Sequence, residues 1–341
     1  MTAPYEFVCD DSDPMWLEHR RSMITGTVAP QLLGLHRFGS LLETYAEMRM
    51  GVTADDADVD ARIRMDWGSD QQDAVVLNLQ RRLGLAARRT GALLRSTRYP
   101  WLGATLDAWV VADERVPIQC PAGTQLPFEV KTTRSRHAAE EWEDDVPPDV
   151  RAQVQTQIIV TGAPGALVGA VVFGAPPAFA WLERDDAMCD RIIDESKKFY
   201  DRVQRGDPPP PSGAPDDAQA LERIAGQREG ATELDIEAVR LVEELAIYEA
   251  EAARVKAEID RRKQLLIRAL GSAEEGLLPG GGALTYRAQT RRGGVIIPGE
   301  ERLDGVRAAL ADAGWAADEL ARVRAQPATT FRVLRRRSKG G

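Results

Sequence analysis

An acid and an amine lie two residues apart in the apolar stretch Leu126–Thr133, whose sequence is LPFEVKTT. Side chains two residues apart on a β-strand point to the same face of a sheet, about 6.6 to 6.8 Å apart along the strand. We therefore predict that Glu129 and Lys131 share one face, while Phe128 and Val130 point the opposite way into the core. Such a strand would be anchored by burial and would present chemistry from its other side.

Two further polar residues could act with this pair. Asp107 lies in a β-rich run upstream, and Gln153 lies in a helix-like segment downstream. Cleavage of a phosphodiester with Mg²⁺ needs oxygen ligands for a hard cation, activation of water, and positive charge for the transition state. Asp107 and Glu129 could supply two carboxylates, Val130 its backbone carbonyl, and Lys131 the charge or the activation of water. Each motif alone also has a structural explanation, because an E-x-K pair can form an exposed ion pair and an aspartate can end a strand.

The elements that must position these residues follow from hydrophobic periodicity. Helical patterns cover residues 41–50, 63–83, 149–160 and 185–203, and strand-like runs cover residues 91–98, 105–112, 126–132, 166–173 and 179–182. Their order predicts an α/β fold in which helices flank a mixed central sheet. In the helix at 149–160, Gln153 and Gln157 share one face. An additional helix at 28–35 would be capped by the Thr27 hydroxyl.

The remainder of the chain predicts an α+β extension. The prolines 208–211 indicate a stiff linker, followed by a helical piece near 218–224. Apolar residues on a 4-3 spacing from Leu234 to Leu266 predict one helix of roughly 38 residues, about 57 Å long. Thr232 and Asp235 resemble a capping box at its start, and Gly271 is its expected end. The stripe must be buried either against residues 218–224 or against another chain. Short strands at 283–289, 293–297 and 329–334 would surround a helix at 301–313.

Composition limits the classes of protein to which this chain could belong. The 341 residues are 43% hydrophobic and contain no apolar run near 18 residues and no secretory leader, so we expect a cytoplasmic protein with no membrane segment. Three cysteines and three histidines lack the spacing of a zinc or iron–sulfur site. The net charge is −9, yet no acidic residue follows Glu319 and basic residues gather there. Because local potential governs polyanion binding, this tail is either a nucleic-acid contact or a solvated end.

The polar residues fall within an ordered set of short motifs. In chain order these are Trp16-x-x-x-Arg20, Ile24-Thr-Gly-Thr27, Met65-Asp-Trp-Gly68, Gly103-Ala-Thr-Leu-Asp107, Phe128-Glu-Val-Lys131, Ala152-Gln-Val-Gln155 and Val160-Thr-Gly162. The set resembles the YqaJ and lambda exonuclease family of phage recombination nucleases, within the PD-(D/E)XK superfamily. The resemblance implies a YqaJ-like exonuclease domain at residues 1–206. A proline-rich linker with a short helix would follow at 207–231, and a long helix with a small basic α+β region at 232–341.

The resemblance also implies roles for particular residues. The catalytic group would be Asp107, Glu129, Lys131 and Gln153. Asp107, Glu129 and the Val130 carbonyl would hold Mg²⁺, for which Mn²⁺ could substitute. Arg20 and Thr27 would bind a DNA 5′-phosphate, and Arg37 is a further candidate whose surroundings match the family less well. A guanidinium and a hydroxyl at a helix start suit that task.

Two departures from the family pattern bear on activity. Four residues after Gly68 the family has a glutamate that contributes to the metal site, and here the residue is Gln72. An amide oxygen can ligate Mg²⁺ but brings no negative charge, so binding of a second metal would be weakened or altered. Leu106 and Ala108 replace the usual proline and glycine beside Asp107. The iron–sulfur relatives of the family, which carry four cysteines, are excluded by the cysteine count.

The resemblance implies a metal-dependent 5′→3′ exonuclease that resects double-stranded DNA ends to 3′ single strands for phage-type homologous recombination. Its partners would be duplex ends, a single-strand annealing protein and further copies in a trimeric ring, and it would be phage or prophage encoded in a bacterial host cell. Two alternatives remain open at this point. One is a catalytically weakened DNA-end binding protein, and the other is an endonuclease on the same core.

Overall fold

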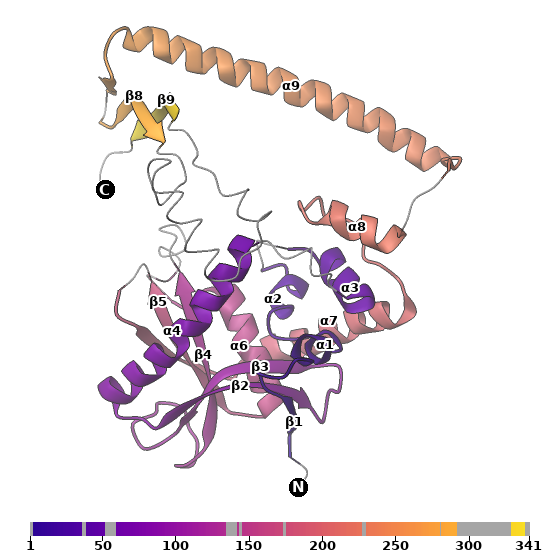
Figure 1. Cartoon of the computed structure of the whole chain (residues 1–341), viewed down its shortest axis with the longest axis vertical. Helices are drawn as coiled ribbons and strands as arrows, with labels where there is room; N and C mark the ends of the chain where they lie inside the picture. The colour runs from indigo at the N-terminus through magenta and orange to yellow at the C-terminus, as the bar shows by residue number, and fades with distance from the viewer. Residues whose placement is uncertain are drawn as a thin grey trace, which may run out of the picture. The chain divides into compact units, whose positions relative to one another are not determined.

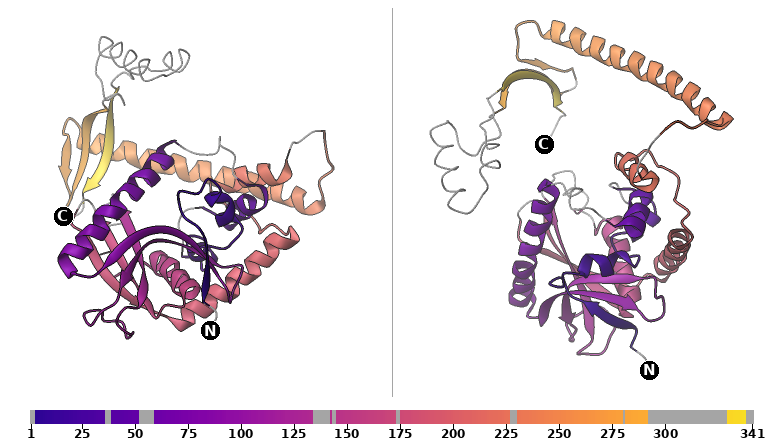
Figure 2. Two further views of the ribbon diagram at one scale, coloured as in Figure 1. Left: turned by 60° about the horizontal axis from the view of Figure 1, so that its bottom comes forward. Right: turned by 45° about the vertical axis from the view of Figure 1, so that its right-hand side comes forward.

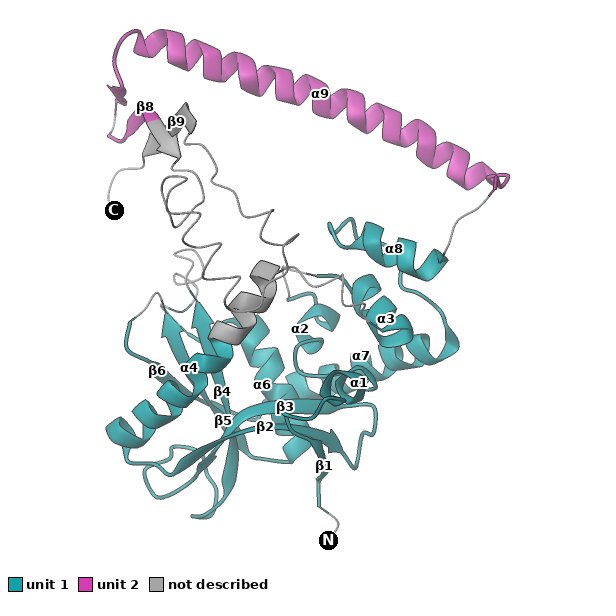
Figure 3. Ribbon diagram, in the orientation of Figure 1, with its two compact units in different colours: residues 1–229 teal, residues 230–341 magenta. Residues whose placement is uncertain are grey.

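The computed structural model describes residues 3–35, 39–51, 59–133, 142, 145–172, 175–226, 230–279, 281–291 and 329–337. The chain divides into two compact units, residues 1–229 and residues 230–341 (Figure 3). In the described part, no helix is both long enough and apolar enough to cross a membrane.

A six-stranded sheet forms the centre of the first unit (Figure 1). Its strands are β1 (Tyr5–Cys9), β2 (Ala87–Ser96), β3 (Gly103–Val111), β4 (Gln125–Thr133), β5 (Gly165–Val172) and β6 (Ala178–Glu183). They lie side by side in chain order. All neighbours are antiparallel except β4 and β5, which are parallel and joined through a helix. The predicted mixed sheet is thereby confirmed.

Helices cover both faces of this sheet (Figure 2). They are α1 (Trp16–Arg21), α2 (Ala29–Leu32), α3 (Leu41–Met50), α4 (Val59–Leu83), α6 (Pro148–Thr161), α7 (Asp186–Arg205) and α8 (Asp217–Ala225). On one face, Val75 and Leu79 of α4 cluster with Phe128 of β4. On the other, Val154 and Ile158 of α6 cluster with strand β5. Strand β4 therefore runs between two helices.

The polar residues of β4 face α6, and this changes one expectation. Phe128 is fully buried beneath α4, as its place on the opposite face predicted. Glu129, however, is only 3% exposed, because α6 lies directly over it. The acid is part of the interior and is not on an open surface. A buried carboxylate must have hydrogen-bond partners, and these define the site described below.

Two features of the N-terminal segment were not predicted. Strand β1 pairs with β2, so that Tyr5 lies opposite Ser96, a residue far away in the chain. The sequence of a five-residue edge strand gives little indication that it forms a strand, because its partner strand comes from a distant segment. The predicted cap at Thr27 is wrong. Helix α2 begins at Ala29 after Val28, without a side-chain cap, and the Thr27 hydroxyl serves another partner.

The described residues of 207–226 do not form a free linker, because α8 packs against α3. Ala220 clusters with Leu42 and Ala46 of α3. Arg223 Nη2 donates a 2.7 Å hydrogen bond to the carbonyl of Gly51. Residues after the prolines therefore belong to the first unit, which ends at residue 229.

The second unit contains the predicted long helix and a small sheet. Its elements are α9 (Ile236–Leu270), β7 (Glu275–Leu277), β8 (Ala283–Arg291) and β9 (Thr329–Arg337), with β8 in the centre of the sheet. Asp235 caps α9 by accepting the Ala238 N–H, so the capping box at Thr232 is wrong, while the end at Gly271 is confirmed. The predicted strand at 293–297 and helix at 301–313 lie outside the described residues.

Candidate active site at the fork between two strands

The register of β3 and β4 brings the two acids together. The antiparallel pairs run from Val111–Gln125 to Ala108–Phe128, and both strands continue beyond that last pair without pairing with each other. Asp107 and Glu129 are the next residue on each strand, so both stand where the ladder ends. There the Asp107 Oδ2 atom accepts the Val130 N–H at 2.8 Å. A carboxylate thus takes the position that a backbone carbonyl would otherwise fill.

Glu129, Lys131 and Gln153 form a closed ring of hydrogen bonds. Lys131 Nζ lies 2.7 Å from Glu129 Oε1 and donates to Gln153 Oε1 at 2.7 Å. Gln153 Nε2 donates to Glu129 Oε1 at 2.7 Å. Because an ammonium can only donate and a carboxylate can only accept, the orientation of the Gln153 amide is fixed. Gln153 therefore acts here as a link between acid and amine.

A second glutamine of α6 contacts Glu129 and was not among the predicted site residues. Gln157 Nε2 donates to Glu129 Oε2 at 2.5 Å and to the Thr105 carbonyl at 3.2 Å. Gln157 is 1% exposed, so this contact lies in the interior. The available signal was its spacing of one helical turn from Gln153, which places both amides on one face. Together the two glutamines hold both oxygens of the carboxylate.

Gln72 and Arg89 form a chain of contacts that leads to Asp107. Arg89 Nε donates to Gln72 Oε1 at 3.1 Å, and Gln72 Nε2 donates to Asp107 Oδ1 at 2.9 Å. Arg89 also forms an ion pair with Asp11 at 2.9 Å. Because a guanidinium has no acceptor, the Gln72 oxygen must face Arg89 and its nitrogen must face Asp107. In this arrangement Gln72 supports Asp107 through its amide nitrogen and does not turn its oxygen toward the acids. Sequence reasoning missed Arg89.

Desolvation dominates the electrostatics of the site, in which Glu129 is buried and Asp107 half-buried. Burial and the neighbouring Glu129 charge raise the pKa of Asp107 to about 8. Burial opposes the charged form of Lys131, but the adjacent Glu129 carboxylate outweighs it and the pKa of Lys131 is raised. Because a pKa of about 8 keeps Asp107 largely protonated at neutral pH, a divalent cation between the acids would displace that proton. Cation binding would therefore favour the ionised form of Asp107.

The donor set fits a hard cation such as Mg²⁺. Within the described ranges, no group of three or more His, Cys, Asp or Glu side chains could hold a metal ion. Asp107 and Glu129 supply two carboxylates, and Mg²⁺ is commonly bound by one or two carboxylates with water and substrate phosphate. The N–H and carbonyl of one strand residue point to the same edge, so the Val130 carbonyl faces the side of Asp107. Val130 is thus suitably placed as a third oxygen.

The predicted phosphate-binding residues meet at a loop that touches the ring. Arg20 Nη2 donates to Thr27 Oγ1 at 2.7 Å, and the Arg20 guanidinium lies over the Trp16 ring at 5.4 Å. Between Thr25 and Thr27, a Cβ atom added to Gly26 would lie 3.0 Å from both the side chain and the carbonyl of Gln153. The loop therefore packs directly on the glutamine of the acid–amine ring. Arg37 lies outside the described residues.

A backbone bridge holds this loop beside the strand that carries Asp107. Ile24 N donates to the Trp101 carbonyl at 2.8 Å, and Gly103 N donates to the Ile24 carbonyl at 2.9 Å. The bridge pairs Ile24 with Leu102 in parallel. Since β3 begins at Gly103, the loop and Asp107 share one rigid support. The two groups of predicted site residues are brought together by tertiary contacts.

Comparison with known proteins finds one family model and one curated relative of the first unit. A family model described as a YqaJ-like viral recombinase domain matches residues 15–164. "Uncharacterized protein YqaJ" of Bacillus subtilis strain 168 is 27% identical over 227 residues, covering 65% of this chain and 66% of that protein. The chain thus spans just under two thirds of the length of this relative.

The solved structures that match this chain include two exonucleases. The alkaline exonuclease LHK-Exo from Laribacter hongkongensis is 18% identical with a TM-score of 0.45, covering 62% of this chain and 98% of that one. A phage-related exonuclease from Haemophilus somnus 129PT is 10% identical with a TM-score of 0.40, covering 56% and 99%. The match to the family model spans the predicted site residues from Arg20 to Gln153 that the structure describes. Residues 15–164 of this chain are thus similar to YqaJ-like viral recombinase domains.

Proposed function

We propose that the first unit is a Mg²⁺-dependent exonuclease that removes nucleotides from the 5′ ends of double-stranded DNA. The observation that carries this proposal is the meeting of Asp107, Glu129 and Lys131 at the fork between β3 and β4. A buried acid paired with an amine, beside a second and partly buried acid on the adjoining strand, is an unfavourable arrangement for stability alone. They are the groups that metal-assisted hydrolysis of a phosphodiester requires.

Each residue has a defined task in this proposal. Mg²⁺, held by Asp107, Glu129 and the Val130 carbonyl, would polarise the scissile phosphate and lower the pKa of water. Lys131 places positive charge beside the reacting phosphate. Gln153 holds the Lys131 and Glu129 side chains in fixed positions relative to each other, because it forms a hydrogen bond with each of them. The protein thereby aligns groups before the substrate arrives, which is the main contribution of a preorganised site.

The direction of cleavage follows in this proposal from the loop at Gly26. Arg20 and Thr27 would bind the 5′-phosphate of a duplex end, since a guanidinium recognises phosphate through charge-assisted hydrogen bonds. The loop packs on Gln153, so a phosphate held there would place the first linkage near the acids. The product would be a 3′ single strand for homologous recombination.

The remaining partners belong to the same proposal. Duplex DNA ends are the substrate, and a single-strand annealing protein would take up the 3′ strand. The reaction would occur in the cytoplasm of a bacterial host. A trimeric ring, implied by the resemblance stated above, stays a prediction for the first unit.

The test uses linear duplex DNA labelled at one 5′ or one 3′ end. With Mg²⁺ or Mn²⁺, the full chain should release the 5′ label first and leave 3′ single strands. Lys131→Ala should reduce the rate by roughly 100-fold or more, the range seen when one charge-stabilising donor is removed. Lys198→Ala is the matched control, because Lys198 is exposed on α7 and pairs with Glu195. Full activity of Lys131→Ala would refute the proposal.

One observation favours a second candidate, a DNA-end binding protein with weakened cleavage. Gln72 turns its amide nitrogen toward Asp107 where the family carries a glutamate, so the site lacks one negative charge. This candidate predicts that duplex ends are retained in a gel shift while no nucleotide is released under any divalent metal. Nicking of covalently closed circular DNA in the same assay would instead identify an endonuclease.

A further inference from the structure

Helix α9 carries an apolar stripe that nothing in the described part of the chain buries. Not one of the residues from Ile236 to Leu270 is buried. Leu245 is 57% exposed and Tyr248 67% exposed, in the middle of the helix. A helix of this length with an exposed apolar face is not stabilised by its own hydrogen bonds alone. The stripe therefore requires a partner.

The stripe follows a seven-residue repeat. The a positions are Ala238, Leu245, Ala252, Ile259 and Leu266, and the d positions are Leu241, Tyr248, Val255 and Arg262. Apolar residues that recur every 3.5 positions on average stay on one side only if the helix supercoils around a similar helix. The repeat therefore indicates a coiled-coil seam and not a surface that packs on a globular core. Arg262 is the one charged residue in the seam, and it pairs with Glu258.

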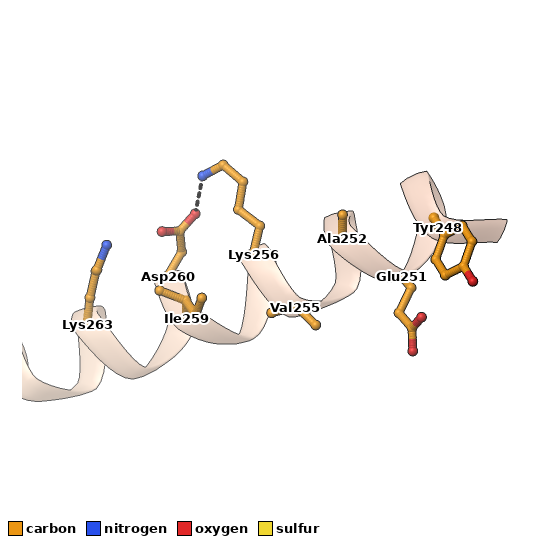
Figure 4. Close-up of a pocket in the computed structure, with 8 residues that line it drawn as sticks. All are labelled: Tyr248, Glu251, Ala252, Val255, Lys256, Ile259, Asp260 and Lys263. Atoms are coloured by element: carbon orange, nitrogen blue, oxygen red, sulfur yellow. Dashed lines mark hydrogen bonds and ion pairs between the residues drawn. The ribbon is translucent and has the colours of Figure 1, made fainter. Parts of the chain in front are cut away.

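Charged residues flank the middle of the seam in a regular order (Figure 4). Glu251 and Glu258 occupy g positions, and Lys256 and Lys263 occupy e positions. The apolar residues Val255 and Ile259 lie between them in a shallow hollow along this single helix. An acid on one side of the seam and a base on the other is the pattern that sets partner and orientation in coiled coils.

This order of charges fits a second copy of α9 in parallel orientation. In a parallel pair, a g residue faces the e residue of the following heptad on the other helix. Glu251 would face Lys256 of the second copy, and Glu258 would face Lys263. Upstream, Glu244 would face Glu249 of the second copy, which gives one repulsive contact against the two attractive ones. In an antiparallel pair, g faces g, and Glu251 would lie near Glu258.

The piece of chain that could have covered the stripe is already engaged elsewhere. Residues 218–224 fall within α8, whose Ala220 is buried against α3. The intrahelical pairs of the e and g residues, such as Lys256 with Asp260, lie on the exposed surface. Exposed ion pairs of this kind contribute little to stability. Exchanging them for ion pairs between two helices therefore costs little free energy.

We propose that α9 joins two copies of this chain as a parallel two-stranded coiled coil. The association uses residues of the second unit and is independent of the nuclease proposal for the first. Two copies of the first unit would then be linked to one coiled coil, each through residues 226–235.

The test is the mass of the full chain in solution, measured by analytical ultracentrifugation. Wild type should contain chains of 37.4 kDa joined in pairs through α9, so the number of chains should be even, whether or not the first units also form the predicted ring. Val255→Lys with Ile259→Lys places charge in the seam and should halve the mass. Val239→Lys with Ile247→Lys is the matched control, because it makes the same exchanges in exposed residues of α9 outside the seam. Equal mass of the seam and control variants would overturn the proposal.

Two further variants remain informative if the seam variant fails to fold. Glu251→Lys with Glu258→Lys, and separately Lys256→Glu with Lys263→Glu, should each associate less than wild type at low salt. An equimolar mixture should restore pairs that contain one chain of each kind. Orientation is read from Ala238→Cys in a Cys120→Ser background, since only parallel helices bring two copies of position 238 together. Absence of the mixed pair, or of the disulfide, would contradict the parallel arrangement.

Discussion

Gln157 Nε2 lies 2.5 Å from Glu129 Oε2, one helical turn beyond the Gln153 amide that holds Glu129 Oε1. The carboxylate is therefore held from both oxygens by side chains of α6. Groups that orient a ligand without touching the metal commonly change affinity or activity by 10- to 100-fold when they are lost. Gln157 is thus a positioning residue for Glu129.

We expect Gln157→Leu to weaken Mg²⁺ affinity and nuclease rate by roughly 10- to 100-fold. The physical reason is that Glu129 loses the donor that fixes its Oε2 atom. Isothermal titration with Mn²⁺ and a single-turnover nuclease assay measure the two effects. Gln155→Leu is the control, because Gln155 is similarly buried on α6 but bonds to the Glu183 carbonyl. It should lower the melting temperature without changing metal affinity.

Gln72→Glu should strengthen metal binding. Arg89 already donates to the side-chain oxygen at this position, so it can pair with a carboxylate there. A third acid beside Asp107 raises the repulsion in the metal-free site and the attraction for a cation. We expect a lower melting temperature without metal, and about a 10-fold lower half-saturating Mg²⁺ concentration. Gln71→Glu makes the same change one residue away on α4, and a similar effect there would argue against the site.

Arg20→Met should reduce the preference for 5′-phosphorylated ends. Loss of a charge-assisted hydrogen bond costs about 1.5 to 3 kcal/mol, or roughly 10- to 100-fold in rate on phosphorylated ends. The rate on 5′-hydroxyl ends should stay near wild type, since no phosphate is recognised there. Initial rates on the two substrates give the ratio. Arg21→Met is the control on the same helix, and an equal loss on both ends would remove Arg20 from phosphate recognition.

Gly26→Ala should disturb Gln153. The added Cβ would lie 3.0 Å from the Gln153 carbonyl, a backbone atom that cannot move away easily. Overpacking of this kind costs about 1 to 3 kcal/mol, and the displaced glutamine should lower the rate on both kinds of DNA end. Gly68→Ala is the control, because its Cβ would meet Thr132 at an ordinary 3.9 Å. Equal rates for the two variants would show that the loop does not support the site.

Asp217 should make the stability of the first unit depend on acid pH. Its Oδ2 atom accepts the N–H groups of Ser212 at 2.5 Å and Gly213 at 2.9 Å. Burial favours the neutral acid, but hydrogen bonds from the Ser40 side chain, Ser212 and Gly213 outweigh it, and the pKa of Asp217 is lowered. A lowered pKa gives stability that is complete above the unfolded value of about 3.9 and is lost as the pH falls through the folded value.

Asp217→Asn should therefore unfold more easily at neutral pH and show a smaller loss of stability below about pH 4. Urea unfolding at several pH values measures this slope. Asp190→Asn, an exposed residue of α7, should retain the wild-type slope. The same slope in both variants would mean that Asp217 does not anchor the loop before α8.

The sequence by itself determined which residues share a face. The two-residue spacing of Glu129 and Lys131 placed both toward α6, and the one-turn spacing of Gln153 and Gln157 aimed both amides back at them. These relationships are local, because strand and helix periods follow from backbone geometry. The heptads of α9 and its end at Gly271 were readable for the same reason.

Only the tertiary structure decided how these faces meet. Asp107 reaches Glu129 because the β3–β4 ladder stops at Ala108, which depends on pairing between distant segments. The Gln72 amide turns its nitrogen toward Asp107 because Arg89, from another strand, occupies its oxygen. Hydrogen-bond direction is set by whichever groups surround a side chain after folding. Periodicity therefore predicts which way a residue points, while long-range contacts determine what it touches.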